Sequence, residues 1–168
     1  MAGDIKQKYG TAEAPTVTNL HSLASSSTFL SGWTSAWIDN TSTLALNSIV
    51  TGSIQSGTSP LAGSIQLYAY AEFPDGADPD LFSSGTEGTQ GTASVHDSEQ
   101  LDASFVFLWS SAVDTTSDQH HVIPPRSIRQ AFGFMPRKWA LYIAHDTSAA
   151  LKSSGSVIHV DHEIGQYT

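Results

Sequence analysis

An alternation of side chains with a period of two constrains this fold more than any other feature of the sequence. It is clearest from Ser64 to Phe73, where every second residue is aliphatic or phenylalanine. Successive side chains of a β-strand point to opposite faces, so the pattern predicts a strand with one buried face. The residues assigned to that face are Ile65, Leu67, Ala69, Ala71 and Phe73.

The same period recurs along the chain and predicts about eight short strands. Clear alternation marks residues 43–54, 64–73, 103–110, 138–145 and 157–164, and weaker signals lie at 15–20, 29–38 and 119–123. Gly, Pro, Asn and Ser gather between these runs, as they do in turns. Short strands at this spacing predict an all-β fold, an antiparallel β-sandwich. A jelly roll is expected first, because it builds two facing sheets from about eight strands.

Two of the predicted strands carry aromatic residues that we assign to the core. In 103–110 the alternation places on one face Ala103, Phe105, Phe107 and Trp109. In 138–145 it places on one face Trp139, Leu141 and Ile143. Large aromatic side chains within an apolar alternation are typical of a sandwich interior.

The sequence predicts an N-terminal arm at residues 1–12 and a single β-sandwich domain at 13–168. The 168 residues leave little room for a second domain. One short helix is expected near 127–132, with Gly133 as its C-terminal stop. The longest predicted irregular stretch is an acidic loop near 74–100, rich in Gly, Ser and Thr.

Composition excludes several classes of function. The net charge is −9, and only 14% of residues are charged against about 25% in a typical domain. Nucleic-acid binding is not expected, because phosphate contacts need clustered Lys and Arg. The chain has no cysteine, so disulfides, zinc–thiolate sites and cysteine nucleophiles are absent. The first ten residues resemble neither a secretory signal nor a transit peptide, and no run of apolar residues predicts a membrane span.

Charge is distributed unevenly along the chain. Eight acidic residues lie between Glu72 and Asp102, and no Lys or Arg occurs between Lys8 and Arg126. A basic cluster then follows at Arg126, Arg129, Arg137 and Lys138. One interpretation is a set of solvated loops with a neutralising patch. The other is a pair of opposite patches that orient neighbouring subunits, since complementary charge fixes register and partner choice.

Neither a metal site nor a catalytic site is expected, so the chain is predicted to be non-enzymatic and without cofactors. His159 and Asp161 share a strand face, and they would bind a metal with His145 only if their strands were adjacent. The acidic residues Asp75, Asp78 and Asp80 do not have EF-hand spacing. Neither a G-x-S-x-G elbow nor a phosphate-binding G-x-x-x-x-G-K loop occurs.

An aromatic platform is a further possibility raised by the sequence. Trp33 and Trp37 are four residues apart and would face the same way in one strand. With Tyr68 and Tyr70 they would stack on sugar rings or enter a subunit interface. This arrangement is the basis of an alternative function, a carbohydrate-binding β-sandwich.

Several stretches of the chain resemble small virion proteins of tailed bacteriophages. They are the opening Met1–Thr11, the segments Leu20–Ser25, Ile38–Ser42 and Ile65–Tyr70, and the later run Ala131–Thr147. The resemblance implies a jelly-roll structural protein of the head decoration (cement) type, often trimeric, located over junctions of the capsid shell. It supplies no catalytic residues.

We therefore predict a virion structural protein that decorates and stabilises a phage capsid by bridging capsid subunits. Its partners would be the major capsid protein or other virion proteins, and further copies of itself in a homo-oligomer, with a trimer favoured. It would be assembled in the cytoplasm of the bacterial host and reside in the virion. A neck, tail or fibre-base component is the nearest alternative. The residues expected to contact partners are Ile5, Lys6, Lys8 and Tyr9 in the arm and Arg126, Arg129, Arg137 and Lys138 in the basic cluster.

Overall fold

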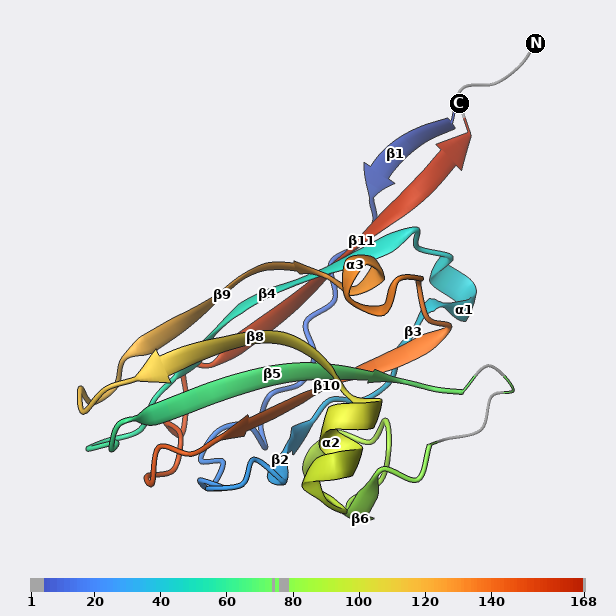
Figure 1. The fold of residues 1–168 in the computed structure, drawn as a ribbon. Helices are drawn as coiled ribbons and strands as arrows, with labels where there is room; N and C mark the ends of the chain where they lie inside the picture. Colours follow the sequence, from blue (N-terminus) through green and yellow to red (C-terminus); the bar gives the residue numbers. More distant parts are fainter. Residues whose placement is uncertain (1–4, 74, 76–78, 168) are drawn as a thin grey trace.

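Two antiparallel sheets pack face to face in the computed structural model, which describes residues 5–73, 75 and 79–167 (Figure 1). The smaller sheet has the strand order β1–β11–β4–β9 and comprises Ile5–Tyr9, Val157–Tyr167, Asn47–Gln55 and His120–Ser127. The larger sheet has the order β6–β7–β2–β10–β5–β8 and comprises Phe82–Ser84, Gly91–Val95, Ser31–Thr34, Lys138–His145, Gly63–Ala71 and Val106–Val113. The two-residue strand β3, Ile38–Asp39, also pairs with β10. The predicted all-β sandwich is confirmed.

The strands outnumber the expected eight within the described residues, because several of the eleven are short. Strands β3 and β6 have two and three residues, too few for alternation to be recognised. The sheets are also unequal, with four strands and seven. The weak strand expected at 15–20 was wrong: residues 15–17 have no regular structure and 18–20 lie in a turn, while the nearby Glu13 forms an isolated bridge to Val160.

The main core lies between the two sheets and follows the predicted alternation. Trp139, Leu141 and Ile143 of the central strand β10 are fully buried there, together with Trp33 of β2 and Val160 of the facing sheet. Ile65 and Leu67 of β5 join them, as the sequence predicted. The aliphatic and indole surface removed from water in this layer provides most of the driving force for the sandwich.

A second core covers the opposite face of the larger sheet. Tyr70 and Tyr142 point to that face and are buried under a cluster that includes Phe82 of β6, Leu101 and Phe105. The cluster is rich in edge-on ring contacts; the Tyr70 and Phe105 centroids, for example, lie 5.3 Å apart. Strand β10 is therefore buried on both faces, which single-face alternation did not predict.

The segment expected to be a long acidic loop at 74–100 carries this second core, and the expectation of irregular structure is corrected. It contains β6, β7 and the start of α2, Ser98–Ser104. Two of its acidic residues bind backbone N–H groups. Asp97 caps α2 by accepting a hydrogen bond from the Gln100 N–H, and Glu87 accepts from the N–H groups of Leu81 and Phe82. Pro74 and residues 76–78 lie outside the described residues.

The other two helices are short and have clear local causes. Helix α3, Ile128–Phe132, begins after Ser127, whose Oγ accepts the Gln130 N–H. It ends at Gly133, which has φ of 78°, as expected from the sequence. Helix α1, Asn40–Thr43, is a single turn capped by Asp39, whose carboxylate accepts from the Thr41 N–H.

Strand β8 contains a bulge that corrects one predicted face. Leu67 pairs with Trp109, but the next residue of β5, Tyr68, pairs with Phe107, so Leu108 is the extra residue. Trp109 and Leu108 are both buried, whereas Phe107 is 55% exposed. The alternation had placed Phe107 in the core.

Candidate functional site: the ribbon end of the sandwich

A two-stranded ribbon projects from one end of the sandwich (Figure 1). It consists of β1 paired with the last part of β11, from Tyr9 opposite Glu163 to Ile5 opposite Tyr167. Strand β4 pairs with β11 only as far as Glu163, so the ribbon continues beyond the sheet. The arm predicted at residues 1–12 is thus held by its own chain's β11, as far as it is described; Met1–Asp4 lie outside the described residues.

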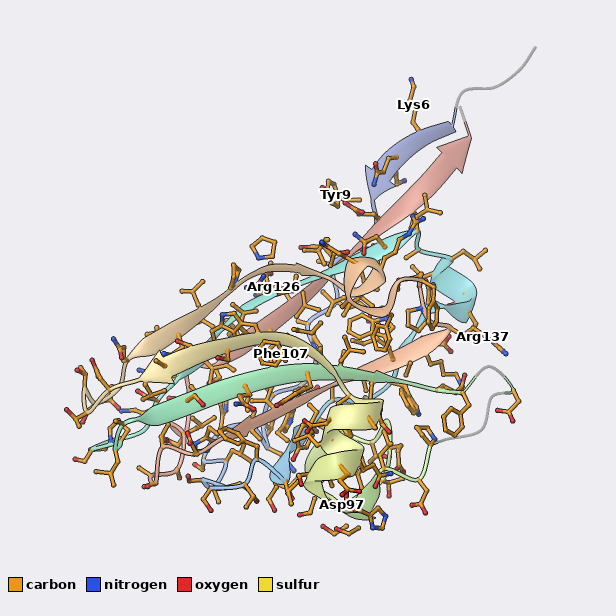
Figure 2. All side chains as sticks on the ribbon, in the orientation of Figure 1. Lys6, Tyr9, Asp97, Phe107, Arg126 and Arg137 are labelled. Carbon is orange, nitrogen blue, oxygen red and sulfur yellow. The ribbon has the colours of Figure 1, made fainter. Side chains whose placement is uncertain are left out.

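The ribbon displays cationic and aromatic side chains. Lys6 and Lys8 fall on one face by strand alternation, and Tyr9 on the other. All three are exposed, Tyr9 by 69%, and Figure 2 shows Lys6 and Tyr9 pointing away from the strands. For Ile5 the structure describes the backbone pairing with Tyr167.

The base of the ribbon is fixed by an amide and an imidazole. The Asn47 side chain donates to Glu163 Oε2 at 2.9 Å and accepts on Oδ1 from Ser127 Oγ at 2.8 Å. The backbone N–H of Arg129 donates to the same oxygen, so one amide joins β4, β11 and α3. Sequence reasoning missed Asn47, because a lone Asn at the start of a strand carries no recognisable pattern.

His162 forms the second anchor and lies beside Gly10, just after the end of β1. Its ring is buried, with Nδ1 2.8 Å from Ser48 Oγ and Nε2 3.5 Å from the Glu13 carboxylate. The Gly10 N–H donates to the His162 carbonyl at 2.7 Å, and Glu13 and Val160 exchange two backbone hydrogen bonds. These contacts hold the arm on the body of the sandwich between residues 10 and 13.

Exposed apolar side chains gather at the same end of the molecule. Leu44 and Leu46 follow α1, and Phe73 and Phe134 border a hollow of about 160 Å³ together with Met135. Isolated exposed apolar residues are ordinary, whereas a group of them beside a projecting element is typical of an interaction surface. The alternation placed Phe73 on the buried face of its strand, which was wrong: β5 ends at Ala71, and Phe73 is 53% exposed. The group has no recognisable sequence pattern, because its members come from three separate turns.

The basic cluster divides once it is placed in three dimensions. Lys138 Nζ lies 2.7 Å from Glu72 Oε1, and the Glu72 side chain is only 3% exposed, so this lysine neutralises a buried acid. Arg137 is exposed near the ribbon end, whereas Arg126 lies on β9, further from the ribbon (Figure 2). Arg129 is also exposed, and its backbone contacts Asn47. Four of the eight predicted contact residues, Lys6, Lys8, Tyr9 and Arg137, thus have exposed side chains at this end, with Arg129 beside the Asn47 anchor.

Electrostatics at this end are set by short local contacts. The Thr41 hydroxyl donates to the Asp39 carboxylate at 2.6 Å and, with the Thr41 N–H, holds the pKa of Asp39 below its ordinary value. The positive charges of Lys138 and Arg137 lower the same pKa further. Lys138 and Arg137 therefore stabilise the ionised form of Asp39.

The metal-binding and aromatic groups suggested by the sequence are not brought together in the described part of the chain. His145 lies on β10 with Nε2 3.0 Å from the Leu23 carbonyl, while His159 and Asp161 lie on β11 in the other sheet. Among the described residues, no group of three or more His, Asp or Glu side chains is arranged to hold a metal ion. The aromatic platform is also corrected: Trp33 and Tyr70 are fully buried, in two different cores.

Nor does any helix in the described part of the chain have the length and apolar character that crossing a membrane requires.

No known family model matches the sequence, and no curated protein is significantly similar to it. The feature that points to a function is the ribbon end, which presents charged, aromatic and aliphatic side chains on an anchored projection.

Proposed function

We propose that the chain is a non-enzymatic virion structural protein that decorates and stabilises a tailed-phage capsid by bridging capsid subunits. The observation that carries this proposal is the ribbon, an anchored projection with Lys6, Lys8 and Tyr9 exposed. A two-stranded ribbon alone is marginally stable in water, so its extension beyond the sheet suits an element that packs against a partner. Tyrosine is favoured in such interfaces, because it buries a large ring and keeps a polar tip.

The mechanism would be additive. Each ribbon end makes a modest contact with the major capsid protein or another virion protein, and a homo-oligomer gains avidity because its contacts act together. The resemblance to decoration proteins favours a trimer and a place in the virion after assembly in the host cytoplasm. The apolar residues Leu44, Phe73 and Phe134 extend the contact beyond the ribbon.

The experiment measures how much of the protein sediments with purified phage heads. Tyr9→Ser is expected to lower the bound fraction, because it removes the exposed ring and leaves the backbone pairing of β1 intact. Val122→Ser is the matched control. The exposed fraction of Val122, 67%, is close to the 69% of Tyr9, but Val122 lies on β9, away from the ribbon. Equal binding of the two variants, or a wild-type chain that never sediments with heads, would refute the proposal.

A neck, tail or fibre-base component remains the second candidate, since a ribbon end would serve any virion junction. Labelling of the intact virion distinguishes the two. Signal over the whole shell is expected for a decoration protein, and signal confined to one vertex would favour the neck or tail.

A further inference from the structure

Most of the described acidic side chains form a hydrogen bond or an ion pair within their own chain. Among the described residues, carboxylates that accept a hydrogen bond or lie in an ion pair include Glu13, Asp39, Glu72, Asp80, Glu87, Asp97, Asp114, Asp118, Asp146 and Glu163. Within that same part of the molecule, Glu99, Asp102 and Asp161 have neither kind of partner. Two of these three, Glu99 and Asp102, lie three residues apart on α2 and therefore on the same side of the helix.

Arg126 is the counterpart on the basic side. Its guanidinium forms no ion pair with any described residue, and its Nε is buried without a hydrogen-bond acceptor. A buried N–H left without an acceptor is costly, which is why native structures nearly always satisfy such groups. Arg126 borders a hollow of about 190 Å³ between β8, β9 and α3, and the apolar residues that line it are Phe107, Leu108, Pro125 and Ala131.

The acids of α2 and the Arg126 hollow belong to one continuous surface. Asp102 is close enough to Tyr68 for its charge to raise the pKa of that phenol, after the larger effect of burial. The Tyr68 and Phe107 ring centroids are 5.5 Å apart, and Phe107 borders the hollow. Figure 2 shows Arg126 and Phe107 on the neighbouring strands β9 and β8, with Asp97 marking the start of α2 beyond them.

This surface is complementary to itself. It carries carboxylates on one side, an exposed phenylalanine in the middle and, on the other side, a guanidinium without an ion-pair partner among the described residues. A two-fold rotation about an axis near Phe107 brings the acids of each copy to the arginine of the other, as an isologous contact requires. The guanidinium fork is suited to carboxylates, which it binds through paired hydrogen bonds.

We propose that two copies of this chain pair through this surface, with Glu99 and Asp102 of one copy bound to Arg126 of the other and the two Phe107 rings packed between them. The occupant is a second copy because the opposite charges that the surface needs are both present on it. The inference rests on the proposed function only in that the chain forms a homo-oligomer, and it gives that oligomer a two-fold interface. The pair differs from the trimer that the resemblance favours, so mass distinguishes them.

The test is the solution mass of the full chain by multi-angle light scattering over a range of concentrations. The wild type is expected to be a dimer. Arg126→Glu and Asp102→Arg are each expected to weaken pairing by at least about 30-fold, as for the loss of one partner of a close interfacial charge pair. The combined variant, with both changes in one chain, is expected to recover the dimer because each junction again joins opposite charges.

Asp161→Arg is the control, since Asp161 has the same unpaired carboxylate but lies on β11, outside the surface. It is expected to remain a dimer. A monomeric or trimeric wild type, or a combined variant no better paired than the single variants, would overturn the inference. Binding to phage heads is measured separately with the Tyr9 variant, so failure of pairing and failure of the proposed function give different results.

Discussion

Replacing Phe105 by alanine tests whether the second core holds the molecule together. Phe105 is 6% exposed and its ring contacts Tyr68, Tyr70, Phe82 and Tyr142, with centroid distances of 5.3–6.4 Å. Truncating a buried phenylalanine costs about 3–5 kcal/mol through lost transfer energy and the cavity left behind. We expect about 4 kcal/mol here, a large part of the roughly 5–15 kcal/mol that stabilises a typical domain.

The matched control is Phe107→Ala, two residues further along the chain. The alternation in the sequence makes the two phenylalanines equivalent, but Phe105 belongs to the second core, whereas Phe107 is 55% exposed with one described ring contact, to Tyr68. We expect Phe107→Ala to cost less than about 1 kcal/mol.

Urea unfolding followed by circular dichroism gives both free energies of unfolding. The protein is kept as dilute as the signal allows, so that association of copies does not contribute. Equal costs for the two variants, or a cost for Phe105→Ala below about 1 kcal/mol, would show that the segment from β6 to α2 does not form an energetically significant core.

Two further predictions concern pH and backbone conformation. Burial lowers the pKa of His145 and of His121 below the ordinary value near 6.5. The unfolded chain therefore binds these protons first, so stability should be constant above that pH and fall below it, by at most about 1.4 kcal/mol per pH unit for each histidine. Urea midpoints at pH 7.5 and 5 measure this, and a midpoint that does not fall on acidification contradicts it. Gly88 has φ of 61°, and a Cβ there would overlap the Trp37 ring, whereas Gly133 has φ of 78° and open space around it. Gly88→Ala should cost more than about 2 kcal/mol and Gly133→Ala about 1 kcal/mol, from backbone conformation alone. Thermal unfolding midpoints compare them, and a Gly133 variant as unstable as the Gly88 variant would be inconsistent with this reasoning.

The sequence allowed some of the exposed residues of the candidate site to be predicted. Charge and position singled out Lys6, Lys8, Tyr9 and Arg137, and all four are exposed at one end of the sandwich. Lys138 looked equivalent to Arg137, but its ion pair with the buried Glu72 gives it a structural role. The partner of a charge depends on which strands are neighbours, and residues 72 and 138 are distant in sequence.

The sequence by itself determined the features that depend on neighbouring residues, namely the buried face of a strand and the ends of a helix. Period-two alternation assigned Trp139, Leu141 and Ile143 to one buried face, because strand geometry alone sends alternate side chains to the same side. The N-cap at Ser127 and the stop at Gly133 fixed α3, because caps act within one turn of the chain.

Tertiary structure decided what covers each face and where each strand ends. The burial of Tyr70 and Tyr142, the outward turn of Phe107 at a bulge and the ribbon formed by β1 and β11 all depend on pairing between distant segments. A strand's sequence shows that it has two faces, but the number of those faces that are buried depends on the layers that pack on the sheet. That packing is a property of the whole chain, so only the three-dimensional structure showed the second core and the projecting end.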